Sequence, residues 1–201
     1  MESAQNAAAP RSPGPGPGPG LVNVANVLTI ARILLVPVFV VCLVAGGTGW
    51  RLTALAVFAV ASVTDLVDGR LARSRGLVTD FGKIADPIAD KALTGAALIT
   101  LSALGELPGW VTAVILIREV GVTLLRFAVI RRGVIAASSG GKLKTLLQVA
   151  AICLYVLPAS LSPPALVKEV VMAAAVVVTL VTGADYVVRA VRLYRTPASP
   201  A

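Results

Sequence analysis

The sequence predicts an all-α fold, a polytopic membrane protein with six transmembrane helices. Of its 201 residues, 57% are hydrophobic and only 14% are charged. A soluble domain of this length needs more polar side chains to cover its surface. Apolar runs close to the roughly 20 residues that cross a bilayer recur along the chain between short polar joins. The composition therefore favours a membrane protein over a soluble domain.

The predicted spans follow one another at about residues 22–45, 51–69, 84–104, 110–130, 143–158 and 165–188. Before them, residues 1–20 end in a Pro-Gly repeat without an apolar core, which is typical of a disordered tail. Glycine or proline interrupts three of the joins, while the joins at about 70–83 and 131–142 are basic. We therefore expect a tail over 1–20, a membrane catalytic domain over 21–195 and a short tail over 196–201.

Basic residues gather on one side of the predicted spans. The N-terminal tail, the two basic joins and the C-terminus hold most of them, whereas the opposite joins carry only Arg51 and Lys168. Because cytoplasmic loops are enriched in lysine and arginine, both termini are expected in the cytoplasm, with the chain in the cell (plasma) membrane. The net charge of +8 then indicates contact with anionic lipids and phosphorylated small molecules, and no nucleic acid partner is expected.

Four of the ten acidic residues lie at the inner ends of the second and third spans: Asp65, Asp68, Asp86 and Asp90. A carboxylate at membrane depth is costly unless it is paired or binds a cation, and four together repel one another. Helical spacing places the first two on one helix face and the last two on one face of the next helix. Carboxylate oxygens suit a hard cation, so we expect Mg²⁺ or Mn²⁺ in a groove open to the cytoplasm.

Small residues accompany the aspartates. Gly69 and Ala72 continue the face of the first pair, and Gly82 lies one turn before the second pair. These positions leave room for a ligand against the backbone, and Arg73 could reach a phosphate held there. Two carboxylates and an arginine alone are also typical of a solvated salt-bridge face. Intramembrane carboxylates further mark proton or cation pathways, so that reading stays open.

The spacing of these residues resembles the signature of the CDP-alcohol phosphotransferase family. The matching positions are Asp65, Asp68, Gly69, Ala72, Arg73, Gly82, Asp86 and Asp90. The resemblance covers about residues 21–195 and implies the family's six-helix membrane fold, its transferase activity and a homodimer. It implies that the aspartates bind two divalent ions and that Asp90 also serves as the base. It further implies that the small residues admit the cytidine nucleotide, that Arg73 meets its phosphates and that Thr79 touches the CDP-linked lipid.

Three further stretches resemble the phosphatidylglycerophosphate synthases within this family. They are Asn26-Val-Leu-Thr29-Ile-Ala-Arg32, Ile117 to Arg126, and Gly140 to Thr145. This resemblance implies that Asn26, Thr29 and Arg32 lie beside the nucleotide. It also implies phosphatidyl transfer from CDP-diacylglycerol to glycerol 3-phosphate. Other acceptors stay open, as in cardiolipin synthases and phosphatidylinositol phosphate synthases. A divalent-cation transporter is the alternative of another class, although ion permeation has no need of Arg73 beside the acids.

A basic set is expected to bind the phosphate of the acceptor: Arg118, Arg126, Lys142 and Lys144. The two arginines lie in an otherwise apolar span, where a charge usually faces a cavity, and they differ by roughly 80° around a helix. The two lysines stand at the cytoplasmic mouth of the following span, where they are also compatible with ordinary positive-inside residues. The expected partners are therefore membrane lipids, CDP-diacylglycerol and a small phosphate-bearing acceptor.

Overall fold

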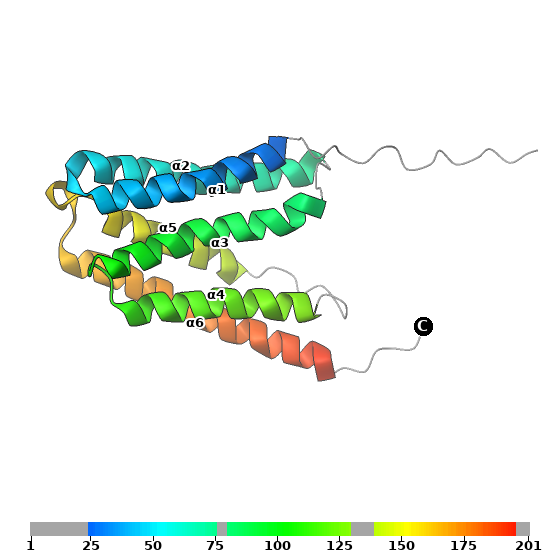
Figure 1. Ribbon diagram of the computed structural model, residues 1–201. Helices are drawn as coiled ribbons and strands as arrows, with labels where there is room; N and C mark the ends of the chain where they lie inside the picture. Colours follow the sequence, from blue (N-terminus) through cyan, green and yellow to red (C-terminus); the bar gives the residue numbers. More distant parts are fainter. Residues whose placement is uncertain (1–23, 76–79, 130–138, 196–201) are drawn as a thin grey trace, which may run out of the picture.

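The structure, a computed structural model, describes residues 24–75, 80–129 and 139–195, without the side chains of 24–26, 65–75, 80–87, 90, 129, 139 and 194–195. The described chain forms six α-helices, one short 3-10 helix and no strand (Figure 1). The α-helices are α1 (Val24–Ala45), α2 (Gly47–Arg75), α3 (Asp80–Ala103), α4 (Gly109–Val129), α5 (Ser139–Val156) and α6 (Ala165–Arg195). The all-α fold class is confirmed, with one helix for each predicted span.

Several helices are longer than the apolar runs that predicted them. The helix α2 continues to Arg75, although its apolar run ended near residue 69, and α6 continues to Arg195. The added turns consist largely of arginine, leucine and alanine, which favour helix but include charges that a criterion of apolar length excludes. The helical framework therefore extends into the basic joins.

The helices run side by side in a bundle of alternating direction (Figure 1). In this bundle α1 packs against α2 and α3, while α6 packs against α4 and α5. Gly46 alone separates α1 from α2, and Gly46 and Gly47 have φ values of 70° and 73°. Glycine reaches this left-handed region without the Cβ clash of other residues. The first two helices therefore form a tight antiparallel hairpin.

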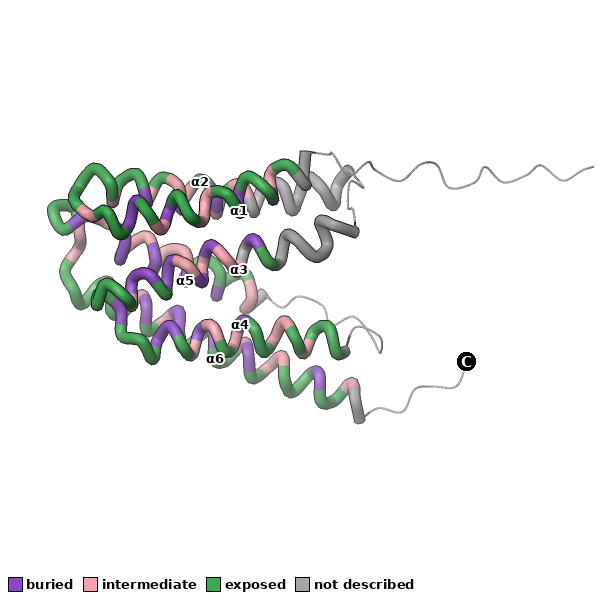
Figure 2. The backbone as a smooth tube through the Cα atoms, in the orientation of Figure 1, coloured by how far each residue is buried: buried purple, intermediate pink, exposed green. Residues whose placement is uncertain are grey.

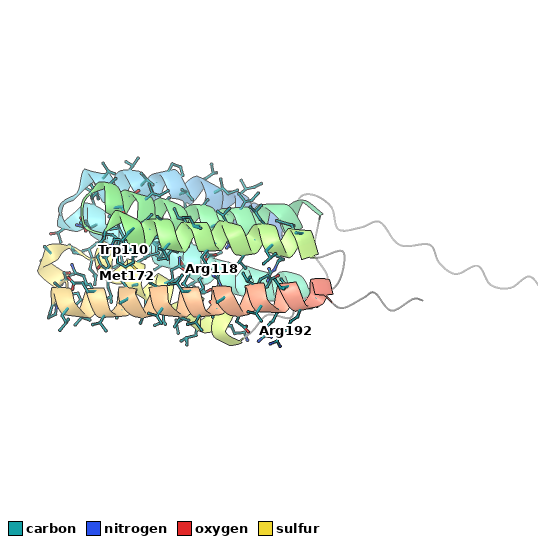
Figure 3. All side chains as sticks on the ribbon, turned by 90° about the horizontal axis from the view of Figure 1, so that it is seen from below. Trp110, Arg118, Met172 and Arg192 are labelled. Carbon is teal, nitrogen blue, oxygen red and sulfur yellow. The ribbon has the colours of Figure 1, made fainter. Side chains whose placement is uncertain are left out.

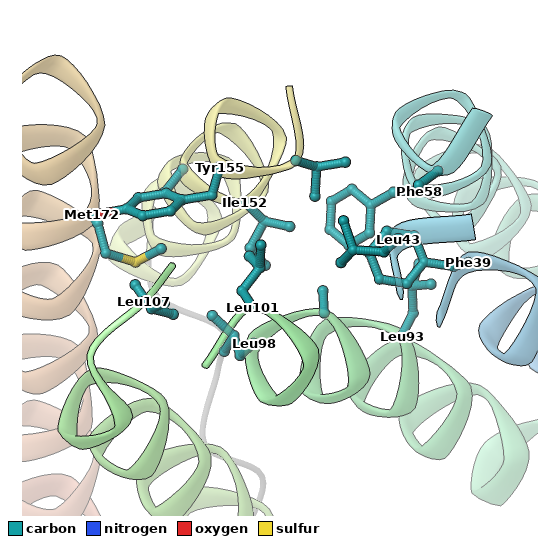
Figure 4. Close-up of a cluster of buried hydrophobic side chains, with 14 of the residues drawn as sticks. Phe39, Leu43, Phe58, Leu93, Leu98, Leu101, Leu107, Ile152, Tyr155 and Met172 are labelled. Carbon is teal, nitrogen blue, oxygen red and sulfur yellow. The ribbon is translucent and has the colours of Figure 1, made fainter. Parts of the chain in front are cut away.

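A core of large apolar side chains joins the α1–α2 hairpin to α3 and α5 (Figure 4). Its fully buried members include Phe39, Leu43, Phe58, Leu98, Leu101 and Ile152. The rings of Phe39 and Phe58 have centroids 5.6 Å apart and planes inclined by 44°, a favourable tilted arrangement for two aromatic rings. This packing fixes the helices relative to one another away from the aspartate positions.

At the end of the bundle where α2 begins, Arg51 links α2 to the segment between α3 and α4 and to the end of α5. The guanidinium of Arg51 forms a two-point ion pair with Glu106, with N···O distances of 2.9 and 2.6 Å. It also donates to the carbonyl oxygens of Tyr155 and Val156, each at 3.1 Å. Because the last carbonyls of a helix lack partners within that helix, Arg51 stabilises the end of α5.

Many residues on the outside of the bundle are exposed (Figure 2), and a large number of these are large apolar residues. On α1, Val27, Leu34 and Val41 are each more than half exposed. Two described segments, Val27–Ala45 and Ala165–Leu193, are long and apolar enough to cross a membrane. Only 28% and 22% of their most apolar parts are buried, unlike the core helix of a soluble protein. The two segments are candidate membrane spans, and six crossings stay a prediction.

Candidate functional site

A buried carboxylate gathers cations from three helices of the bundle. Glu119 on α4 is only 7% exposed. Its Oε2 accepts a hydrogen bond from Nζ of Lys91 on α3 at 2.5 Å, and its Oε1 accepts one from Nζ of Lys144 on α5. Nη1 of Arg118 lies 3.3 Å from the same Oε1. We call these four side chains the Glu119 cluster, and they link α3, α4 and α5 through one carboxylate.

The Glu119 cluster combines three cations with one carboxylate, so its own side chains carry two excess positive charges. The side chains of Lys144 and Arg118 are 10% and 15% exposed, whereas that of Lys91 is 31% exposed. Charges withdrawn from water are stable only where opposite charges or hydrogen-bond partners compensate them. The cluster is therefore suited to an anion with about two negative charges, which would enter beside Lys91.

Arg118 also connects α4 to α6. Its Nε donates to the carbonyl oxygen of Thr179 at 3.1 Å, and its Nη2 donates to Oγ1 of Thr182 at 3.0 Å. With the contact to Glu119, these bonds use three of the five N–H groups of the guanidinium. Arg118 is thus held mainly by protein groups, and the described residues provide no acceptor for its other two N–H groups.

The Glu119 cluster lies well inside the bundle. Figure 3 shows Arg118 between α4 and α6, with Trp110 toward one end of the pair and Arg192 toward the other. Glu119 is ten residues from the start of α4, or roughly 15 Å at the rise of 1.5 Å per residue. Ionisable groups buried this deep between helices need compensating partners, and the Glu119 cluster supplies them.

The structure brings together two of the four residues predicted to bind the acceptor phosphate. Lys144 and Arg118 belong to the Glu119 cluster, whereas Arg126 and Lys142 are exposed and have no ion pair with it among the described side chains. Arg126 lies two turns farther along α4, near its end. Lys142 is two residues from Lys144, which turns it to a different face of α5.

Lys91 and Glu119 are site candidates that the sequence patterns did not single out. The available signals were weak: Glu119 is an acid beside an arginine in an apolar run, and Lys91 directly follows Asp90. A buried charge needs a partner, but the sequence alone does not tell which helices supply it. The contact between α3, α4 and α5 provides that information.

Two of the predicted nucleotide-binding residues face the interior of the bundle. Thr29 and Arg32 on α1 are 1% and 2% exposed. Their helix packs against α2 and α3, which carry the aspartates. Counted along the hairpin from Gly46, Thr29 and Asp65 differ by only two residues, so their backbones lie at a similar depth, within about 3 Å. This arrangement places one predicted nucleotide-binding residue, Thr29, and one predicted metal ligand, Asp65, at a similar level of the bundle.

The backbone places the four predicted metal ligands on two helices. Asp65 and Asp68 lie three residues apart within α2, and Asp86 and Asp90 lie four apart within α3. The end of α2 and the start of α3 are at the same end of the bundle (Figure 1). Four carboxylates, if brought together from these two helices, would be oxygen donors of the kind that Mg²⁺ or Mn²⁺ prefers.

The other predicted site residues near the aspartates lie beyond the described side chains. Gly69, Ala72 and Arg73 are within α2, Gly82 is within α3 and Asn26 is within α1, but their surroundings are not part of the description. The side chains of Asp65, Asp68, Asp86 and Asp90 likewise lie outside the described side chains. Thr79 falls between α2 and α3, outside the described residues. The roles of these residues stay predictions.

Comparison with known proteins connects this arrangement to a reaction class. The profile of the family described as CDP-alcohol phosphatidyltransferase matches residues 22–181. The chain is 57% identical over 175 residues to a protein of Mycobacterium tuberculosis (strain H37Rv) named probable phosphatidylglycerophosphate synthase, covering 86% of this chain and 83% of the relative. It is 39% identical over 181 residues to a Bacillus subtilis protein named CDP-diacylglycerol–glycerol-3-phosphate 3-phosphatidyltransferase, covering 82% and 93%. A Rickettsia bellii protein of that name is 37% identical over 168 residues, covering 82% and 93%.

Proposed function

Because the chain belongs to the CDP-alcohol phosphatidyltransferase family, we propose that it transfers a phosphatidyl group from CDP-diacylglycerol to glycerol 3-phosphate. The products are phosphatidylglycerophosphate and CMP. The observation that carries this proposal is the identity of 57% over 86% of the chain with a relative named for that product. The Bacillus subtilis relative is named for both substrates, which supports the same acceptor. The protein is thus an enzyme of phospholipid synthesis.

The four aspartates on α2 and α3 would hold a pair of divalent ions, Mg²⁺ or Mn²⁺, at one end of the bundle. When bound, such ions polarise a diphosphate and stabilise the charge that develops on the departing CMP. Carboxylates from two separate helices fix the site only while α2 and α3 keep their relative positions. The packing of α1 against both helices supports that requirement.

Asp90 would remove the proton from the 1-hydroxyl of glycerol 3-phosphate. The hydroxyl oxygen then forms a bond to the lipid-linked phosphorus of CDP-diacylglycerol, and the bond from that phosphorus to the bridging oxygen breaks, so CMP leaves with the bonding electrons. An isolated aspartate is a weak base, so its setting must favour proton transfer. Either the hydroxyl would be acidified by the bound metal ions, or repulsion from the neighbouring carboxylates would raise the affinity of Asp90 for the proton.

The nucleotide would lie between α1, α2 and α3. Gly69, Ala72 and Gly82 leave space for the cytidine, while Arg73 meets the phosphates and Thr79 the CDP-linked lipid. Asn26, Thr29 and Arg32 line the same region from α1. The burial of Thr29 and Arg32 supports this assignment because both side chains lie inside the bundle, on the helix that packs against α2 and α3.

The acceptor phosphate would bind to the basic residues of α4 and α5: Arg118, Arg126, Lys142 and Lys144. The excess positive charge of the Glu119 cluster supports Arg118 and Lys144 as the inner part of this site. A phosphate monoester carries about two negative charges, which matches that excess. Arg126 and Lys142, both exposed, would guide the acceptor inward.

We further propose that all six helices cross the cell membrane, with both termini and the active site in the cytoplasm, in a homodimer. The exposed apolar residues of α1 and α6 support contact with lipid. The charge distribution supports the orientation, because Arg126, Lys142 and Arg192 lie at one end of the bundle. The opposite end has the neutralised Arg51–Glu106 pair.

Purified protein incubated with CDP-diacylglycerol and a panel of labelled acceptors tests the reaction. Glycerol 3-phosphate should give phosphatidylglycerophosphate and an equal amount of CMP, whereas phosphatidylglycerol and inositol phosphate should give no product. Cardiolipin or phosphatidylinositol phosphate as the main product would contradict the proposed acceptor. Release of no CMP with any acceptor would contradict the enzymatic activity itself.

A further inference from the structure

The two lysines of the Glu119 cluster come from different helices and meet on one carboxylate. Lys91 of α3 contacts Oε2 of Glu119 and Lys144 of α5 contacts Oε1. The separation of the two ammonium groups is therefore set by the width of a single carboxylate. Without that negative charge the two cations would repel each other at close range in a poorly solvated place. The lysines would then move apart or turn toward water.

Both ammonium groups keep the capacity to bind a second anion. Each has three N–H donors, of which one is directed at Glu119, and among the described residues no other acceptor is seen for the remaining two on either lysine. The side chain of Lys91 is 31% exposed, which gives an anion access to this pair, whereas that of Glu119 is only 9% exposed. A phosphate placed there can bind both lysines while Glu119 keeps them in position.

The position of Lys91 in the sequence relates this site to the proposed chemistry. Lys91 directly follows Asp90 on α3, so one helix turn carries both the phosphate anchor and the proposed base. The phosphate and the reacting hydroxyl are at opposite ends of glycerol 3-phosphate. A single rigid helix can therefore control the distance between the bound phosphate and the base, which favours correct orientation of the hydroxyl.

We propose that Glu119 is a positioning residue that holds Lys91 and Lys144 together as the binding site for the phosphate of the acceptor. This inference rests on the proposed function, and it adds Lys91 to the acceptor-binding residues. Glu119 itself touches no substrate. Its contribution is to fix two cations from α3 and α5 at one point, in a part of the bundle where their mutual repulsion would otherwise separate them.

The experiment compares the wild-type full chain with Glu119→Gln, Glu119→Asp and Lys91→Gln in detergent. Glu119→Gln preserves size and hydrogen-bonding capacity but removes the charge, and Glu119→Asp retains the charge. Glu169→Gln is the matched control because Glu169 is an exposed acid on α6. Two quantities are measured: the glycerol 3-phosphate concentration that raises the melting temperature half-maximally, and the KM for each substrate in the CMP-release assay.

In Glu119→Gln and Lys91→Gln, the KM for glycerol 3-phosphate should rise by roughly tenfold or more, the usual effect of losing a charged hydrogen bond. The half-maximal concentration in the melting assay should rise in parallel, while the KM for CDP-diacylglycerol stays unchanged. Glu119→Asp should recover part of the loss, and Glu169→Gln should behave as wild type.

An unchanged or lower KM for glycerol 3-phosphate in Glu119→Gln would overturn the positioning role, since a lower KM would mean that Glu119 competes with the phosphate. If Glu119→Gln does not fold, Lys91→Gln decides, because its side chain is partly exposed and an unaltered acceptor KM there excludes the site. Wild-type protein that releases no CMP with glycerol 3-phosphate would instead refute the proposed function. The turnover-independent melting assay separates these two failures.

Discussion

Gly183 on α6 leaves the space in which Arg118 of α4 lies across the helix. A Cβ atom at residue 183 would be 3.0 Å from Cγ of Arg118 and 3.2 Å from its Nε. The same guanidinium reaches Thr179 and Thr182 on α6, and Glu119 on its own helix. The absence of a side chain at one position of α6 thus permits the contact between α4 and α6 at the edge of the Glu119 cluster.

Gly183→Val should displace Arg118 from α6. A branched side chain in this space forces Arg118 to move, and overpacking of this kind costs about 1–3 kcal/mol of stability. We expect a lower melting temperature and a higher KM for glycerol 3-phosphate. Gly121→Val is the control, since Gly121 is an exposed helical glycine with no neighbour within 4 Å of a built Cβ. Equal effects of the two substitutions would show that helix propensity alone is responsible.

Arg51→Ala should weaken the fold without affecting the chemistry. The variant loses the ion pair with Glu106 and the hydrogen bonds to the carbonyls of Tyr155 and Val156, a loss of about 1–3 kcal/mol. The melting temperature should fall while both KM values stay unchanged. Arg189→Ala is the matched control because its pair with Asp185 is exposed and contributes about 0.5 kcal/mol or less. A change in the KM of Arg51→Ala for glycerol 3-phosphate would contradict this prediction, because it would show that the contacts of Arg51 affect the distant acceptor site.

Activity should require a divalent ion. Chelator is expected to abolish CMP release, and Mg²⁺ or Mn²⁺ should restore it, because the four aspartates cannot approach one diphosphate without cations. Asp65→Ala and Asp86→Ala, one from each helix, should each remove metal-dependent turnover. Elemental analysis of the purified variants checks metal content directly. Full activity in chelator, with no metal bound, would end this assignment.

Asp90→Asn should lower turnover by about a hundredfold or more, in line with the contribution of a general base. The amide has the size of the carboxylate but cannot accept the proton. Binding of CDP-diacylglycerol should survive better than turnover as long as metal is retained. Asp185→Asn, at a partly exposed aspartate on α6, makes the same chemical change away from the site. Near-normal turnover of Asp90→Asn would place the base elsewhere.

Ala72→Leu should block the nucleotide and leave the helix intact. Leucine is a good helix former, and residue 72 lies inside the continuous helix α2. The variant should be folded and monodisperse, with greatly weakened binding of CDP-diacylglycerol and a normal response of the melting temperature to glycerol 3-phosphate. If CDP-diacylglycerol binds to Ala72→Leu as to wild type, this face of α2 does not meet the cytidine.

The sequence was sufficient to predict the number and approximate bounds of the helices. Apolar runs separated by glycine, proline and basic joins correspond one to one with α1 to α6. The helix ends were less predictable, because α2 and α6 continue for several residues into charged segments such as the one ending at Arg75. Helix formation depends on backbone hydrogen bonds and propensity, and these do not stop where the hydrophobicity does.

The candidate site was predictable only where its residues lie close together in sequence. Asp65 and Asp68, or Asp86 and Asp90, share a helix, so their relation follows from helical spacing. The Glu119 cluster depends on which helices are neighbours, which spacing does not reveal. Arg118 was accordingly expected to face a pocket for the acceptor. In the structure most of its hydrogen bonds go to Thr179 and Thr182 of α6.

The single residue between α1 and α2 has a consequence for how the chain is made. Only Gly46 separates the two helices, so they are synthesised one directly after the other. No long polar loop between them could hold the chain on one side of a bilayer while the second helix is made. If both helices cross the membrane, as proposed, they should enter it together as a hairpin. The direction of the amino terminus would then depend on the basic residues that follow α2 as much as on those that precede α1.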